Sequence, residues 1–250
     1  MDHRGARRQL TRVAPGVAQV YLLTNDWFGL DFQRTALAEC RLRGAILTLV
    51  MADPVRGMTP SKRWRTRRTR PIRERIETVR RGTVVRLVED VNDRRFCGSV
   101  PHGAHGAVTG FNQILRKPTI DRFASLVNVH PSLLPYYRGP APVYWCQVHG
   151  ENQSGFTIHE VTEKVDDGPV LRQGVVTIAG SVDPLQTIVD VALPHFGEWI
   201  GSVLDGAPFP HVTVDATAVY RVLDGYRPRL SADERADALR RSGRTGRRVD

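Results

Sequence analysis

An asparagine and a histidine stand one residue apart in Asn128-Val129-His130-Pro131, and their side chains are of types that can move a proton and hold a negative charge. Side chains alternate faces along a strand, so Asn128 and His130 point to the same side while Val129 turns into the protein. An amide donor beside an imidazole can stabilise an oxyanion during proton transfer. Alone, such a pair is more often a turn residue beside a surface histidine, so its surroundings decide.

A dense series of short motifs follows this pair. They are, in order, Ser132-Leu133-Leu134-Pro135, Arg138-Gly139, Trp145, Gly150-Glu151, Gly155-Phe156-Thr157 and Asp166-Asp167-Gly168-Pro169. This order resembles the folate-dependent formyltransferase family, whose members include enzymes acting on methionyl-tRNA, glycinamide ribonucleotide and sugar nucleotides. The resemblance is dense from about Gly110 to Gln173 and looser elsewhere.

The resemblance implies a catalytic trio of Asn128, His130 and Asp166. An amine attacking a formyl carbon creates a tetrahedral oxyanion, which the Asn128 amide and a protonated His130 can hold. The Asp166 carboxylate would keep His130 cationic and help to take the proton from the amine. Asp167 is the alternative carboxylate, but the separation of 38 residues between Asn128 and Asp166 fits the spacing of the family.

The resemblance also implies that 10-formyltetrahydrofolate is the co-substrate. Its expected contacts are Phe111, Gln113, Ile114, Leu115, Ser132, Leu133, Leu134, Pro135, Val161, Thr162 and Asp166. Ordinary core packing is the alternative for the side chains of Ile114, Leu115 and Val161. No metal is expected, because the zincin-like run that starts at His159 has Glu163 where a second histidine ligand would stand.

Apolar runs bounded by turn residues alternate with helical patterns along most of the chain, which is typical of β-α-β units. The fold class is therefore α/β with a mostly parallel sheet, and the resemblance implies a Rossmann-like fold with helices on both faces. Strands are predicted at 20–23, 45–50, 83–88, 106–111, 125–130, 155–159 and 170–178. Helices are predicted at 30–42, from Pro71, at 142–149 and at 184–204, the last with a kink at Pro194.

Composition suggests three parts of the chain. We expect a basic N-terminal tail over residues 1–16, a catalytic domain over 17–206 and a partly flexible C-terminal extension over 207–250. The net charge of +10 comes almost wholly from arginine, and a loop over 53–70 is especially rich in it. A basic surface favours encounters with anionic partners such as phosphates or nucleic acid.

The sequence holds no run of the roughly 18 apolar residues that a membrane-spanning helix needs, and no signal peptide follows Met1. We therefore expect a cytoplasmic protein without a membrane partner. Cys40, Cys97 and Cys146 are odd in number and far apart, which predicts reduced thiols rather than disulfides. The oligomeric state is open, with a homodimer among the alternatives.

Formyl transfer to a small-molecule amine or hydroxylamine is the leading hypothesis, with an amino sugar, an aminoglycoside-like metabolite or hydroxyornithine as acceptor. The 44 residues after Gly206 are too few for the C-terminal domain of the family's tRNA enzyme, which favours a small acceptor. The arginine-rich loop and the net charge favour tRNA instead. Hydrolysis of the formyl donor by water is a further alternative, and a non-catalytic folate or RNA binder is the last.

Overall fold

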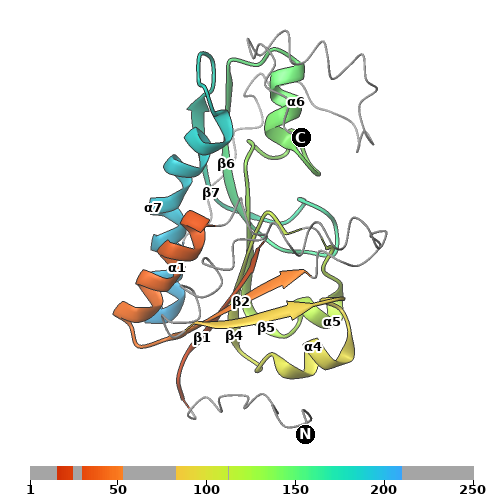
Figure 1. Cartoon of the computed structure of the whole chain (residues 1–250), viewed down its shortest axis with the longest axis vertical. Helices are drawn as coiled ribbons and strands as arrows, with labels where there is room; N and C mark the ends of the chain where they lie inside the picture. Colours follow the sequence, from red (N-terminus) through yellow and green to blue (C-terminus); the bar gives the residue numbers. More distant parts are fainter. Residues whose placement is uncertain (1–15, 25–29, 53–82, 112, 210–250) are drawn as a thin grey trace, which may run out of the picture.

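The computed structural model describes residues 16–24, 30–52, 83–111 and 113–209 (Figure 1). Four predicted segments lie wholly or almost wholly outside these residues: the N-terminal tail apart from Gly16, the arginine-rich loop over 53–70, the helix expected from Pro71 and nearly all of the C-terminal extension. The helices and strands below run from Gln19 to Asp205.

A seven-stranded sheet forms the centre of the molecule, in the order β3-β2-β1-β4-β5-β6-β7. The strands are β1 Gln19–Thr24, β2 Ile46–Ala52, β3 Val84–Val88, β4 Ala104–Thr109, β5 Phe123–His130, β6 Gln153–Glu160 and β7 Val170–Thr177. β1 to β5 run parallel to one another, whereas β6 is antiparallel to both β5 and β7. This confirms the predicted mostly parallel sheet.

The interior strand β1 shows why both faces of the sheet are covered. Val20 and Leu22 belong to one buried hydrophobic cluster, while Tyr21 and Leu23 belong to another. Because successive side chains of a strand point to opposite faces, a run of consecutive apolar residues needs a layer of protein on each side. The sequence of β1 therefore requires helices on both faces.

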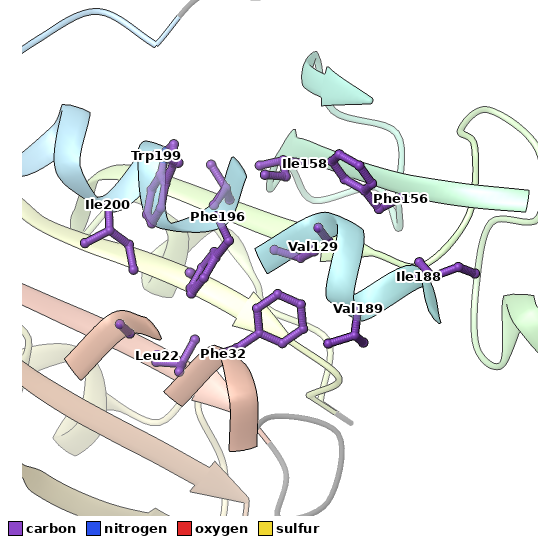
Figure 2. Close-up of a cluster of buried hydrophobic side chains, with 14 of the residues drawn as sticks. Leu22, Phe32, Val129, Phe156, Ile158, Ile188, Val189, Phe196, Trp199 and Ile200 are labelled. Carbon is purple, nitrogen blue, oxygen red and sulfur yellow. The ribbon is translucent and has the colours of Figure 1, made fainter. Parts of the chain in front are cut away.

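Helices α1 (Leu30–Leu42) and α7 (Pro184–Asp205) lie side by side over one face (Figure 1). The rings of Phe32 on α1 and Phe196 on α7 meet edge to face with centroids 5.1 Å apart, within the cluster drawn in Figure 2. Asp183 caps the start of α7 by accepting a hydrogen bond from the backbone of Gln186. The helix continues through Pro194.

The opposite face carries two short helices, α4 (Arg94–Ser99) and α5 (Lys117–Ile120), which contribute Phe96 and Ile120 to the second cluster. A further helix, α6 (Pro142–Val148), follows β5. The sequence did not predict α4 or α5, because helices this short show no periodic apolar pattern. The hydrogen bond from Phe96 N–H to the Asp93 side chain marks the beginning of α4.

The seven predicted strands are all present, with one clear shift. The fourth strand was predicted at 106–111, but β4 runs from Ala104 to Thr109. Gly110, with a φ of 65°, turns the chain out of the sheet immediately afterwards. Phe111 therefore lies in the loop after the strand, at the edge of the sheet where ligands bind in α/β proteins.

The three cysteines are free, and Cys40 and Cys146 are buried. Burial raises the pKa of Cys40 to about 12 and that of Cys146 to about 11, which suits packed rather than reactive thiols. Within the ranges that the structure describes, none of the helices combines the length and the apolar character that crossing a membrane requires.

Candidate active site

Asn128 and His130 lie at the carboxyl end of β5, where Pro131 ends the strand. Their side chains share one face, and Val129 between them is 3% exposed within the cluster under α7, as predicted. In open α/β sheets this edge faces the ligand crevice. The fold therefore presents an amide and an imidazole side by side at the expected position.

The neighbouring strand β6 brings two more polar residues to the same place. In the antiparallel register, His159 stands opposite Asn128 and Thr157 opposite His130. Side chains of directly opposed residues project to the same face of a sheet. The ends of β5 and β6 thus gather four polar side chains, of which His130, Thr157 and His159 are at most 4% exposed.

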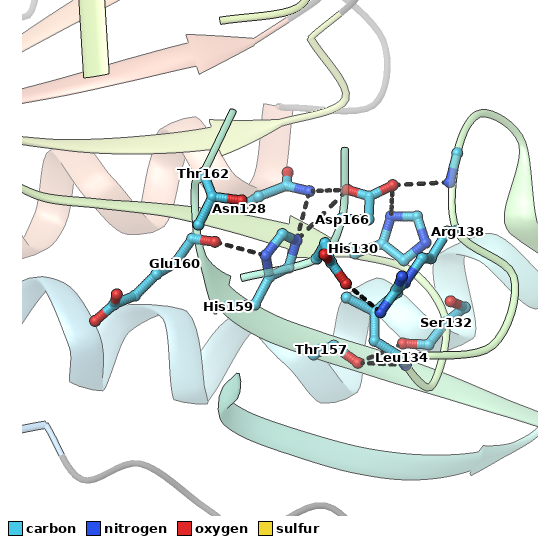
Figure 3. Close-up of polar contacts among 12 residues, drawn as sticks. Asn128, His130, Ser132, Leu134, Arg138, Thr157, His159, Glu160, Thr162 and Asp166 are labelled. Atoms are coloured by element: carbon cyan, nitrogen blue, oxygen red, sulfur yellow. Dashed lines mark hydrogen bonds and ion pairs between the residues drawn. The ribbon is translucent and has the colours of Figure 1, made fainter. Parts of the chain in front are cut away.

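Asp166 reaches this group from the loop between β6 and β7 (Figure 3). Its Oδ1 accepts a hydrogen bond from Asn128 Nδ2 at 3.1 Å, and its Oδ2 accepts one from the backbone N–H of Gly139 at 2.8 Å. Oδ2 also lies 3.5 Å from His130 Nδ1. The structure therefore brings together the three residues that the sequence predicts to be catalytic.

The backbone around Asp166 is unusual. Among the described residues other than glycine, a positive φ occurs at Tyr137, Ala141 and Asp166, all in loops that flank the group. Such conformations cost free energy and are concentrated at functional sites. Asp166 has a φ of 49°, so its backbone is strained in the way that is typical of functional residues.

The surroundings of Asp166 favour its ionised form. Burial opposes ionisation, but the hydrogen bond with His159, the charge of His130 and the Gly139 N–H outweigh it and lower the pKa of Asp166 to about 2. Asp166 is therefore a carboxylate at neutral pH, close to the buried side chains of His130 and His159.

His130 is held on both sides of its ring. Nε2–H donates to the backbone carbonyl of Tyr137 at 2.8 Å, which leaves Nδ1 facing Asp166. Burial lowers the pKa of His130 below 6.5, because it outweighs the opposing effects of Asp166 and the Tyr137 carbonyl. The structure thus favours a neutral His130 in the protein without substrate, although Asp166 acts on the pKa of His130 in the expected direction.

Asp167, the alternative carboxylate, points elsewhere. It forms ion pairs with Arg138 and, at 3.8 Å, with Lys164. Its role in the structure is to tie the loop after β6 to the loop after β5. This arrangement favours Asp166 over Asp167 as the carboxylate of the group.

His159 is the residue that the sequence reasoning missed. Its Nε2 lies 3.1 Å from Asn128 Nδ2 and 3.5 Å from Asp166 Oδ1. A signal was present, because Thr157-Ile158-His159 repeats the polar-apolar-polar alternation of Asn128-Val129-His130 on the next strand. The antiparallel register that joins the two triplets was not evident from the sequence.

Hydrogen bonds also fix the turn that follows His130. Thr157 Oγ1 donates to the Ser132 carbonyl at 2.6 Å and accepts from the Leu134 backbone N–H and from Gln173 Nε2 (Figure 3). The Ser132 hydroxyl donates to the Tyr136 carbonyl at 2.9 Å. The turn is therefore anchored to β6 and β7 independently of any ligand.

The expected folate contacts after β4 divide into two kinds. Gln113 has both ends of its amide engaged, with Oε1 accepting from Val91 N–H and Nε2 donating to the Glu89 carbonyl. This side chain joins the loops after β3 and β4. Leu115 is buried in the second hydrophobic cluster, whereas Ile114 is 65% exposed and can meet a ligand.

The other expected folate contacts divide in the same way. Ser132, Leu133 and Leu134 are buried, so Pro135 is the exposed member of that run. Val161 packs partly against the second cluster, as Phe111 does, while Thr162 is exposed. The segments around Phe111 and Val161 therefore converge on one apolar cluster, although contact with folate stays a prediction for all of these residues.

No group of three or more histidine, cysteine, aspartate or glutamate side chains suited to a metal ion occurs in the part of the chain that the structure describes. Three acid-base residues, Asp166, His130 and His159, do meet at the site. Their side-chain nitrogen and oxygen atoms form hydrogen bonds with other groups of the protein instead of converging on a metal position. The arrangement suits acid-base chemistry with an oxyanion donor.

Comparison with known proteins gives a consistent result. Residues 105–191 match the family model described as formyl transferase. A methionyl-tRNA formyltransferase from Trichlorobacter lovleyi is 37% identical over 110 residues, which cover 44% of this chain and 34% of that protein. The chain thus spans about a third of the length of this curated relative.

Two solved structures share the fold. A sugar N-formyltransferase from Shewanella sp. FDAARGOS_354 has a TM-score of 0.59 at 14% identity, covering 90% of this chain and 87% of that chain. A sugar 3N-formyl transferase, solved in the presence of dTDP and 5-N-formyl-THF, has a TM-score of 0.56 at 13% identity, covering 90% and 79%. The matched region contains Asn128, His130, His159 and Asp166.

Proposed function

We propose that this chain, which belongs to the formyltransferase family through residues 105–191, transfers a formyl group from 10-formyltetrahydrofolate to an amine. One observation carries the proposal. An ionised carboxylate, a neutral imidazole and an amide donor meet at the carboxyl end of β5, with Asp166 3.1 Å from Asn128 and 3.5 Å from His130.

His130 and Asp166 together suit the proton transfer that the reaction requires. When the amine attacks the formyl carbon, a C–N bond forms, the carbonyl π electrons move to the oxygen and the amine nitrogen becomes acidic. A neutral His130 can take the proton at Nδ1, where the ionised Asp166 stabilises the resulting imidazolium. The oxyanion then re-forms the carbonyl, the C–N10 bond breaks with its electron pair going to N10, and His130 returns the proton to that nitrogen.

Asn128 supplies the complementary electrostatic role. Its amide N–H groups lie beside the imidazole, and a hydrogen bond from one of them to the formyl oxygen strengthens as negative charge develops there. Burial of the surrounding side chains keeps water away and so increases the effect of each charge. Proton transfer by His130 and oxyanion stabilisation by Asn128 require both side chains on one face of the strand, which is where they lie.

The residues present fit the folate co-substrate. The segments around Phe111 and Val161 adjoin the same apolar cluster, and each carries an exposed apolar side chain, Ile114 at 65% and Val165 at 50%. A flat heterocycle can bind at the edge of this apolar cluster, because its ring buries apolar surface while backbone groups of the loops form hydrogen bonds with its polar atoms. When bound, the folate supplies the activated formyl group.

A small-molecule amine is the acceptor that we propose. Sugar N-formyltransferase structures match nine-tenths of the chain in fold, which supports an acceptor of that size. Methionyl-tRNA is the second candidate, because the curated relative with the matching segment acts, by its name, on methionyl-tRNA. Both acceptors present a primary amine to the same carboxylate and imidazole.

The purified chain, incubated with 10-formyltetrahydrofolate, tests the proposal in separate arms with a dTDP-linked amino sugar, with other small amines and hydroxylamines, with methionyl initiator tRNA and without acceptor. We expect release of tetrahydrofolate together with a mass gain of one CO unit on a small amine. Formylated tRNA would replace the small acceptor with the second candidate. Release of formate without acceptor would indicate a hydrolase.

Two controls make this experiment decisive. Asn128→Ala should lower turnover by about 10²-fold, the usual effect of removing one oxyanion donor. His105→Gln, at the opposite end of the sheet, should leave turnover within a few-fold. Absence of tetrahydrofolate release in every arm, from a folded protein, would refute the proposed function.

A further inference from the structure

Three side-chain atoms form a nearly equilateral triangle in the site. Asn128 Nδ2 is 3.1 Å from Asp166 Oδ1 and 3.1 Å from His159 Nε2, and the last two atoms are 3.5 Å apart. The angle at Nδ2 is much smaller than the angle between the two N–H bonds of a planar amide. Both acceptors therefore lie on one side of the amide and can share one N–H as a three-centre hydrogen bond, which leaves the second N–H available to a ligand.

The protonation of His159 follows from its other nitrogen. Nδ1 lies 2.8 Å from the backbone carbonyl of Glu160, which can only accept, so Nδ1 carries a hydrogen. In the neutral ring Nε2 then has a lone pair directed at Asn128. Both atoms that face the Asn128 amide are thus acceptors, and they select its NH₂ end over its carbonyl end.

We propose that His159 is a positioning residue which, with Asp166, holds the NH₂ end of Asn128 toward the reacting oxygen. This inference rests on the proposed formyl transfer. An asparagine amide with one acceptor can rotate, and a rotated amide presents its carbonyl to the oxyanion, which repels it. The lone pair of His159 keeps the free N–H aimed correctly.

Two variants test the inference against wild type. In His159→Ala we expect kcat to fall about tenfold with the KM for the formyl donor within about threefold, because a hydrogen bond that orients a catalytic group is lost while folate contacts remain. His159→Gln keeps an acceptor oxygen for the Asn128 amide and should recover most of kcat. His105→Gln, the matched control, should retain the wild-type kcat and KM.

A readout that needs no turnover accompanies the kinetics. The two ¹H–¹⁵N signals of the Asn128 side-chain amide should be well separated in wild type, because the acceptors hold the amide in one orientation. In His159→Ala the two signals should move toward each other, and in His159→Gln they should stay near their wild-type positions. A wild type without formyl transfer would refute the proposed function alone. An active wild type matched by His159→Ala, or Asn128 amide signals that His159→Ala leaves unchanged, would overturn the role of His159.

Discussion

Both faces of β5 are buried, but apolar packing dominates one face and directional hydrogen bonds dominate the other. Val129 faces the cluster under α1 and α7, where Phe32, Phe196 and Trp199 make non-directional apolar contacts. Asn128 and His130 face a polar group in which each described hydrogen bond joins a specific donor to a specific acceptor. The apolar side of the strand thus contributes mainly to the stability of the fold, and the polar side mainly to the proposed reaction. Substitutions on the apolar side should therefore change the free energy of unfolding, and those on the polar side should change turnover.

Phe196→Ala should give the largest loss of stability on the apolar side. The ring is fully buried, meets Phe32 at 5.1 Å and stacks on Trp199 at 6.2 Å. Removing such a ring costs about 3–5 kcal/mol through lost transfer free energy and the cavity left behind. Urea unfolding measures the loss, and turnover per folded molecule should stay within a few-fold of wild type. A stable Phe196→Ala protein with impaired turnover would break the proposed separation.

Asp166→Asn should show the converse on the polar side. The variant keeps the shape of the side chain but removes the charge that stabilises protonated His130, so turnover should fall by about 10²- to 10³-fold. Initial rates of tetrahydrofolate release measure the effect. Asp167→Asn is the matched control, because it removes only the ion pairs with Arg138 and Lys164 and should stay within a few-fold. Equal losses in both variants would contradict the choice of Asp166.

The smallest expected effect is a dependence of stability on acid. The pKa of Asp166 is about 2 in the folded protein against an ordinary 3.8, so its ionised form stabilises the fold above about pH 4, and this stabilisation is lost as pH falls toward 2. The contribution is about 2 kcal/mol. Urea unfolding at about pH 5 and about pH 2 should show a smaller decline in Asp166→Asn than in wild type. Equal declines would show that Asp166 is not held as a carboxylate.

The same comparison explains what could be predicted from the sequence. The strands were found because apolar runs such as Val20–Leu23 are local signals, and the resemblance located Asn128, His130 and Asp166 by motif. His159 could not be found in this way, since its position depends on the antiparallel register of β5 and β6. The protonation preference of His130 depends on burial by distant segments, which no local pattern reports.

The helices were recovered unequally for a related reason. α1 and α7 have long amphipathic patterns and were predicted nearly to their ends, whereas α4 and α5 depend on a cap and on loop contacts. Likewise, Gln113 was expected to contact folate, and its engagement with the backbone of Glu89 and Val91 emerges only when the loops after β3 and β4 are brought together.

The register between β5 and β6 fixes the positions of four polar residues relative to one another, namely Asn128, His130, Thr157 and His159. A substitution changes one side chain, but deleting one residue within β6 would turn His159 and Thr157 to the apolar face and bring Ile158 into the site. Changes of length are equally damaging in the loops that carry Arg138 and Asp167, because Gly139 and Asp166 reach the site from there. New acceptor specificities are therefore better sought by exchanging exposed side chains than by changing the length of these segments.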